Sequence, residues 1–128
     1  MNEAIIGVIV GGLIAWVAPL LTLRYTERRW KIESKMAYLK SERERFEKLY
    51  EVNLQRFGKG VADNSYSSEM SAEILTIMPK EIKDLYTNWM ADKEKNDSKR
   101  KGVYLDMAVA MKKDLAKRDS EIRELFEK

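Results

Sequence analysis

The sequence predicts an all-α protein in which an N-terminal transmembrane helix continues into a long charged helix and then a small helical hairpin or bundle. Residues 4–23 carry no charge, residues 24–57 contain no glycine or proline, and the remainder repeats its apolar residues at helical spacing. No segment shows the sustained alternation of a half-buried strand. We therefore predict an anchor at 1–23, a juxtamembrane helix at 24–57, and a helical module at 58–128 that packs on the long helix.

The composition limits the chemistry that the chain can perform. Its 128 residues include no cysteine and no histidine, which excludes disulfides, thiolate zinc sites and imidazole bases. No paired carboxylate motif suggests another catalytic centre. We expect neither an enzyme nor a site for a metal or cofactor. The 24 basic and 21 acidic residues, of which only Glu3 precedes residue 24, are too evenly mixed for a disordered basic arm.

The predicted anchor is the uncharged run from Ala4 to Leu23. A helix of this length extends about 30 Å, which matches the hydrocarbon core of a bilayer. A cleaved signal peptide is a poorer interpretation, because Glu3 stands where a base is expected and Pro19 follows the best small residue, Ala18. A buried core helix is also disfavoured, since so small a domain could hardly surround twenty apolar positions.

The charges that flank the anchor predict its orientation. No Lys or Arg precedes the run and several bases follow it, so the positive-inside rule places the tail in the cytoplasm and the N-terminus outside. This topology is that of a single-pass protein of the cell inner membrane. The residues expected at the membrane interface are Arg24, Tyr25, Arg28, Arg29, Trp30 and Lys31.

Small residues recur every four positions along the anchor, at Gly7, Gly11 and Ala15. Such a stripe lets two transmembrane helices approach closely, so it predicts a homo-oligomer packed through this face. The alternative interpretation is that glycine is simply frequent in transmembrane helices.

The juxtamembrane helix carries a heptad seam, in which spacings of four and three residues alternate. Its members are Tyr25, Arg29, Ile32, Met36, Leu39, Arg43, Phe46, Tyr50, Asn53 and Phe57. This seam could pair with its own copy or pack against later helices of the same chain. Further apolar residues beside it, such as Leu49 and Val52, broaden the apolar face and favour packing within the chain.

Turn-forming residues predict where the first elements end and begin. Gly58 is expected to end the long helix as a left-handed C-cap. Ser67 or Ser68 is expected to cap the next helix, and Pro79 to take the first position of the helix after it.

The C-terminal part is predicted as a linker followed by two helical pieces. Acids and bases interleave over residues 92–101, which we expect to form the linker. A helical region follows at 103–115, and Asp119 or Ser120 is expected to cap a last short helix.

Three short motifs are distributed along most of the chain. They are Glu27–Lys31 (ERRWK), Ala72–Ile82 before a helix with an aromatic residue (Tyr86 or Trp89), and Ala110–Leu115 (AMKKDL). Together they resemble a group of small bacterial single-pass membrane proteins with an N-terminal anchor and a helical cytoplasmic tail that ends in an AM-basic-basic-DL motif. The chain departs from that pattern at Ala116, where a glycine is usual. The resemblance implies an anchored helical architecture and a bacterial source, and it implies no activity.

Basic residues of the tail are candidate contacts for an anionic ligand. They are Lys99, Arg100, Lys101, Lys112 and Lys113. A further cluster surrounds Asp114, and its ordinary interpretation is an exposed helical turn whose ion pairs are each worth less than about 1 kcal/mol.

These features give two functional hypotheses. The first is a membrane-anchored helical interaction or scaffold protein that self-associates and can bind a protein partner. The second is a ligand-gated membrane effector, as in phage defence, whose basic tail binds a nucleotide second messenger or a nucleic acid.

Overall fold

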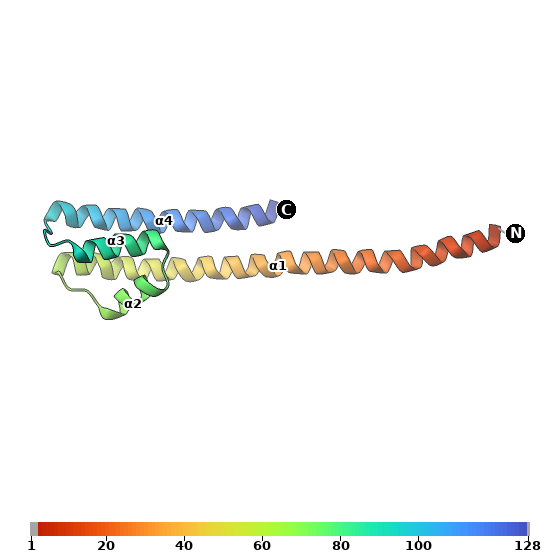
Figure 1. Ribbon diagram of the computed structural model, residues 1–128, viewed down its shortest axis with the longest axis horizontal. Helices are drawn as coiled ribbons and strands as arrows, with labels where there is room; N and C mark the ends of the chain where they lie inside the picture. The colour runs from red at the N-terminus through yellow and green to blue at the C-terminus, as the bar shows by residue number, and fades with distance from the viewer. Residues whose placement is uncertain (1–2, 128) are drawn as a thin grey trace. The chain divides into compact units, whose positions relative to one another are not determined.

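The computed structural model describes the backbone of residues 3–127 and the side chains of residues 15 and 17–127. Within these residues the protein is all-α, as predicted, and contains no strand (Figure 1). The four helices are α1 (Glu3–Asp63), α2 (Ser68–Thr76), α3 (Lys80–Ala91) and α4 (Asp97–Glu127).

The chain divides into two compact units. The first comprises Met1–Tyr38, and the second comprises Leu39–Lys128. The first unit contains part of α1 only, whereas the second contains the C-terminal part of α1 together with α2, α3 and α4.

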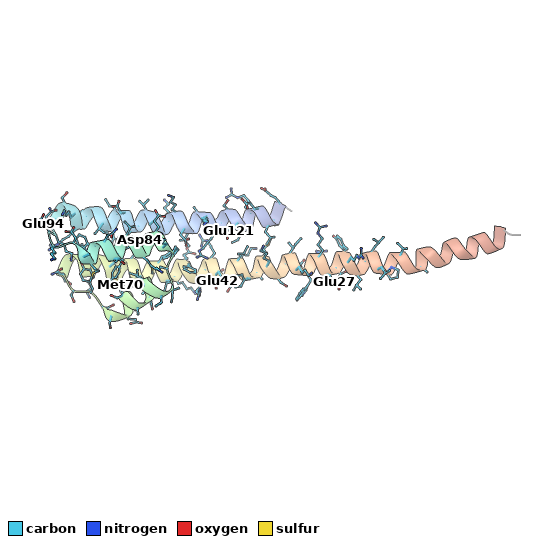
Figure 2. All side chains as sticks on the ribbon, in the orientation of Figure 1. Glu27, Glu42, Met70, Asp84, Glu94 and Glu121 are labelled. Atoms are coloured by element: carbon cyan, nitrogen blue, oxygen red, sulfur yellow. The ribbon has the colours of Figure 1, made fainter. Side chains whose placement is uncertain are left out.

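The first unit displays its apolar side chains. Val17, Leu20, Leu21 and Leu23 are each 48–60% exposed, and the sticks around Glu27 stand out from the helix (Figure 2). Among the residues whose side chains are described, no helical stretch is both long enough and apolar enough to span a membrane. Most of the predicted anchor, residues 4–14 and 16, lies outside those described side chains.

Helix α1 ends six residues later than predicted. It runs without interruption through Gly58 and Gly60 to Asp63, and the left-handed residue that follows is Asn64, with φ of 53°. The amide of Ser65 donates to the carbonyl oxygen of Gly60 at 3.1 Å, which is the long hydrogen bond of a Schellman motif. The prediction that Gly58 caps this helix was therefore wrong, because asparagine supplies the left-handed residue.

The two glycines have a steric role inside the helix. A Cβ atom at Gly58 would lie 2.8 Å from Cε2 of Tyr104, and one at Gly60 would lie 2.8 Å from the carbonyl oxygen of Ser65. Both distances are well below van der Waals contact. Glycine therefore allows the Tyr104 ring and the chain after α1 to lie directly against the helix backbone.

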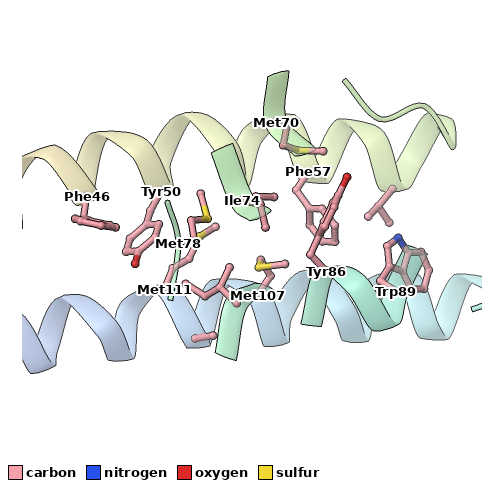
Figure 3. Packing of buried hydrophobic residues seen from close by; sticks show 13 residues of the cluster. Phe46, Tyr50, Phe57, Met70, Ile74, Met78, Tyr86, Trp89, Met107 and Met111 are labelled. Carbon is pink, nitrogen blue, oxygen red and sulfur yellow. The ribbon is translucent and has the colours of Figure 1, made fainter. Parts of the chain in front are cut away.

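The core of the second unit is built from all four helices (Figure 3). From α1, the seam residues Phe46, Tyr50 and Phe57 are buried, together with the polar seam residue Asn53. The other buried apolar residues are Val61, Met70, Ile74, Met78, Ile82, Tyr86, Trp89, Met107, Ala110 and Met111. Within residues 39–63, the seam thus packs against later helices of the same chain, as the sequence favoured.

Helices α2 and α3 begin close to the predicted positions. The hydroxyl oxygen of Ser67 accepts a hydrogen bond from the amide of Met70 at 3.1 Å, so the predicted N-cap of α2 is confirmed. Pro79 is the N-cap of α3 rather than its first residue. The two helices present Met70 and Ile74, and then Ile82, to the core.

Helix α4 is one continuous helix of 31 residues, which corrects two predictions. The second half of the expected linker is helical, because Asn96 caps it by accepting a hydrogen bond from the amide of Lys99 at 2.8 Å. No second helix starts at Asp119 or Ser120. The carboxylate of Asp119 instead accepts a hydrogen bond from Nε of Arg43 at 2.8 Å, so its partner lies on α1.

Helix α4 runs antiparallel to the end of α1 within the second unit. Residues that increase in number along α1 meet residues that decrease along α4: Arg43 contacts Asp119, Tyr50 contacts Asp114, and Gly58 faces Tyr104. Helix α3 packs against α4 in the same unit. This arrangement brings the N-terminal bases of α4 next to the C-terminal turns of α1.

Candidate functional site

A basic groove lies between the last turns of α1 and the first turns of α4. Its volume is about 440 Å³. It is lined by Gly58, Val61, Ala62, Asp97, Arg100, Lys101 and Tyr104. We call it the α1–α4 groove. Its size lies in the range of small-ligand sites, and two of its lining residues are among the predicted anion contacts.

The two bases of the α1–α4 groove differ in their partners. Nη1 of Arg100 lies 3.5 Å from Oδ1 of Asp97, one turn earlier on the same helix, in a partly exposed ion pair. Lys101 is exposed and forms no ion pair within the described part of the chain. Tyr104 provides an aromatic wall because Gly58 leaves room for its ring. The groove therefore combines two cations and one carboxylate, that of Asp97, with the flat face of an aromatic ring.

The remaining predicted anion contacts lie elsewhere. Lys99 lines a different groove between α3 and α4, where its Nζ lies 3.4 Å from Oδ2 of Asp92. A hydrogen bond from the amide of Glu94, with a smaller effect from Lys99, lowers the pKa of the Asp92 carboxyl, which therefore keeps its negative charge near neutral pH. Lys112 and Lys113 are exposed further along α4. The structure thus brings together two of the five bases.

Asp114 forms a contact between α4 and α1 that the sequence did not predict. Its side chain is only 16% exposed and accepts hydrogen bonds from the Tyr50 hydroxyl at 2.6 Å and from Nε of Arg118 at 2.9 Å. The guanidinium of Arg118 stacks 3.7 Å from the centre of the Phe46 ring. The exposed turn expected for Asp114 was therefore the wrong interpretation, because α1 covers it.

This contact also changes the acidity of the tyrosine. Burial, and then the hydrogen bond to the negatively charged Asp114, raise the pKa of Tyr50 well above its ordinary value. Tyr50 therefore stays protonated and remains a donor throughout the physiological range. The sequence signal that could have identified the pair was a seam tyrosine facing a carboxylate, but that signal requires knowing which helix faces the seam.

The buried polar seam residue joins α1 to α2. Nδ2 of Asn53 donates to Oε2 of Glu73 at 2.7 Å and to the carbonyl oxygen of Leu49 at 2.9 Å. Nη1 of Arg56 lies 3.6 Å from the same Glu73 oxygen. A buried amide whose partner is on another helix fixes the register between the two helices, since a slip would leave it unpaired.

The predicted membrane-interface residues lie in the first unit and are exposed. Tyr25 and Trp30 are 67% and 66% exposed, and Nε of Arg29 pairs with Oε1 of Glu33 at 3.0 Å in solvent. Arg24, Arg28 and Lys31 are exposed as well. Ala15 is also exposed. Gly7 and Gly11 lie outside the residues whose surroundings are described, so their packing role stays a prediction.

No cluster of three or more potential metal ligands occurs among the described residues. Protein-family models, curated proteins and solved structures gave no match to this chain.

Proposed function

We propose that this protein is a self-associating, membrane-anchored helical interaction protein whose tail lies on the cytoplasmic side of the inner membrane. The supporting observation is the run Ala4–Leu23, twenty residues without charge. Its described large apolar side chains, Val17, Leu20, Leu21 and Leu23, are about half exposed. Exposed apolar side chains that lie within a few residues of one another favour an apolar environment, and a bilayer surrounds a helix of this length on every side.

The bases that follow the anchor support its orientation. The side chains of Arg24, Arg28 and Lys31 are exposed and available to the anionic lipids of a cytoplasmic leaflet, where each base contributes about 1 kcal/mol. Tyr25 and Trp30 are exposed at the same level, as amphipathic rings at headgroup depth are.

The second unit supports a role in interaction. Its carboxylates Asp114, Asp119 and Glu73 hold helices together. Its core is mostly apolar, with Asn53 as its buried polar member, and apolar side chains remain on its surface at Leu75, Leu105 and Val109. A small bundle with engaged carboxylates and exposed apolar residues is suited to helix–helix recognition.

Membrane fractionation tests the anchor. The intact chain is expected in the pellet after alkaline carbonate extraction, whereas a variant with Leu13→Lys and Val17→Lys is expected in the supernatant, because each lysine inside the hydrocarbon core costs up to about 2.5–3.5 kcal/mol of insertion. Leu75→Lys, an equally apolar and exposed position on α2, is the matched control and should stay in the pellet. Release of the unaltered chain by carbonate would overturn the proposal.

The absence of cysteine allows a direct test of topology. A single cysteine introduced as Asn2→Cys is expected to react with a membrane-impermeant maleimide in intact cells. Glu127→Cys should react only after the membrane is opened. The reverse pattern would contradict the proposed orientation.

Self-association through the anchor is tested at its glycine stripe. Gly11→Ile places a branched side chain where close helix approach needs none, so cross-linking of the full chain in membranes should decrease. Unchanged cross-linking would show that this face is not the contact.

The α1–α4 groove supports a second candidate function, the binding of an anionic nucleotide messenger. Arg100 and Lys101 can contact phosphates while Tyr104 stacks on a base. Calorimetry of the detergent-solubilised chain with a cyclic dinucleotide tests it. Binding should weaken with salt and fall with Lys101→Ala but not with Lys112→Ala, which removes an exposed base outside the groove. Absence of binding at low salt would remove this candidate.

A further inference from the structure

The outer face of α4 carries an apolar strip without a partner. Leu105 and Val109 are 61% and 63% exposed. They lie on the side of the helix opposite the buried residues Met107, Ala110 and Met111, as the angular spacing of about 100° per residue requires. The strip is therefore not an edge of the core, and nothing in the second unit covers these two side chains.

Small residues extend the strip in both directions. Ala116 is exposed, and a Cβ atom added at Gly102 would meet nothing within 4 Å. The positions 102, 105, 109, 112 and 116 have spacings of three, four, three and four residues, which is the a/d pattern of a heptad repeat. The only charged member is Lys112, whose long side chain can direct its ammonium group to solvent.

The charges beside the strip are complementary to a second copy of the strip itself. With Gly102 and Val109 at a and Leu105 at d, Lys101 occupies a g position and Asp106 the following e position. In a parallel pair, each g residue faces the e residue five positions later on the other helix. Two Lys101–Asp106 pairs would therefore form across the interface, one on each side.

These two charges are also free to form such pairs. Lys101 and Asp106 are both exposed, and neither forms an ion pair within the described residues. Other charges of α4 are already engaged: Arg118 pairs with Asp114 at 2.9 Å, and Asp119 with Arg43 at 2.8 Å. The bundle thus leaves unpaired the charges that flank the uncovered strip.

We propose that the outer strip of α4 (Gly102, Leu105, Val109, Lys112 and Ala116) is the surface through which two copies of this chain pair in parallel. A β-branched residue at a with leucine at d favours a parallel two-stranded pair. The inference deepens the self-association proposed above, on which it rests, by naming a contact outside the anchor.

Disulfide cross-linking of the full chain in membranes tests the arrangement. In a parallel pair each a or d residue faces its own copy, so Leu105→Cys and Val109→Cys should each give a disulfide-linked dimer on mild oxidation. Leu75→Cys, an exposed leucine on α2, is the matched control and should remain monomeric. Cross-linking at Val109 without cross-linking at Leu105 would indicate an antiparallel crossing near Val109 and overturn the proposal.

Charge reversal provides a second test in detergent. Lys101→Glu should weaken dimerisation about fivefold, because the two ion pairs across the interface become repulsive contacts. The double variant Lys101→Glu with Asp106→Lys should restore the dissociation constant. A loss that the second change fails to repair would show that these residues do not face each other.

The anchor separates failure of this inference from failure of the proposed function. Ala15→Cys, which replaces a stripe residue that already carries a Cβ atom, reports pairing of the transmembrane segments in the same membranes. If Ala15→Cys forms dimers and the two α4 variants do not, the α4 surface is wrong and the self-associating anchor stands. If none of the three forms dimers, self-association itself is wrong.

Discussion

The two halves of α1 carry the same heptad seam but have different environments. In the first unit, the seam residue Tyr25 is 67% exposed, and the seam residues Ile32 and Met36 are only partly buried. In the second unit, Phe46, Tyr50 and Phe57 are buried. The same periodic seam is thus largely exposed in the first part of the helix and buried in the last part.

This difference shows that a seam identifies a face and not its partner. Periodicity places the seam residues between 25 and 57 on one side of a helix. Burial of Phe46 and Phe57 comes from α2, α3 and α4, which belong to the second unit. The polar members follow the same division, because Arg29 pairs with Glu33 on its own helix whereas Arg43 pairs with Asp119 on α4.

Truncating an aromatic residue in each half should separate the two environments most clearly. Phe57→Ala is expected to lower the free energy of unfolding by about 3–5 kcal/mol, because the ring is fully buried and leaves a cavity. Tyr25→Ala, at an exposed seam position of the first unit, should change it by less than about 0.5 kcal/mol. Denaturant unfolding of the solubilised chain, followed by circular dichroism, measures both. Equal losses in the two variants would contradict the division into two environments.

Adding one methyl group to a glycine should distinguish the crowded end of α1 from an open helix surface. Gly60→Ala is expected to destabilise the second unit by about 1–3 kcal/mol, because its Cβ would lie 2.8 Å from a backbone oxygen that cannot easily move. Gly102→Ala, made in α4 where the Cβ meets nothing, should stabilise by about 1 kcal/mol through helix propensity alone. Melting temperatures should therefore move in opposite directions, and a shared direction would reject the steric account.

Alkaline pH should weaken the buried part of the seam through Tyr50. Its pKa is raised in the folded state by burial and by Asp114, so the folded chain holds this proton more tightly than the unfolded chain does. The resulting stability is fully present below the ordinary tyrosine pKa of about 10 and is lost progressively above it.

Tyr50→Phe isolates this effect. The variant should lose about 1–2 kcal/mol near neutral pH, since Asp114 loses one donor, and its stability should decline less steeply above pH 10. Tyr25→Phe, at an exposed tyrosine in the first unit, should leave the profile unchanged. Parallel alkaline declines in Tyr50→Phe and the unaltered chain would exclude Tyr50 as the responsible group.

Double-mutant cycles on the two seam arginines should give the smallest difference. The Arg43–Asp119 pair, partly shielded between α1 and α4, is expected to contribute about 1 kcal/mol. The Arg29–Glu33 pair, with both side chains more than 60% exposed, should contribute about 0.3–0.5 kcal/mol. Added salt should reduce the second value more strongly. A larger coupling energy for Arg29–Glu33 would reverse the comparison.

Several local features were predictable because they depend on neighbours in the sequence. Ser67 caps α2 as expected, since a cap needs only the amide three residues later. The buried period from Phe46 to Phe57 followed from spacing alone. The predicted set of anion contacts was only partly correct. Arg100 and Lys101 line the α1–α4 groove, whereas their neighbour Lys99 lines a different groove.

Other features failed because their cause is distant in the sequence. Gly58 was expected to end the helix, yet it lies inside α1, where the absence of a Cβ atom leaves room for the Tyr104 ring. Asp119 is a residue type that often caps helices, yet it lies inside the continuous helix α4 and accepts a hydrogen bond from Arg43. Asp114 was expected in solvent, and Tyr50 covers it. In each case the deciding partner is more than forty residues away.

The sequence by itself determined the helical class, the apolar faces and the uncharged run Ala4–Leu23, because composition and a period of 3.6 residues are local properties. Tertiary structure alone decided which part of the seam is buried, why Gly58 is a glycine, and that Tyr50 and Asp114 form one contact. These outcomes depend on which helix lies opposite each residue. Packing of the helices determines which residues face one another, and the local sequence around one position does not specify it.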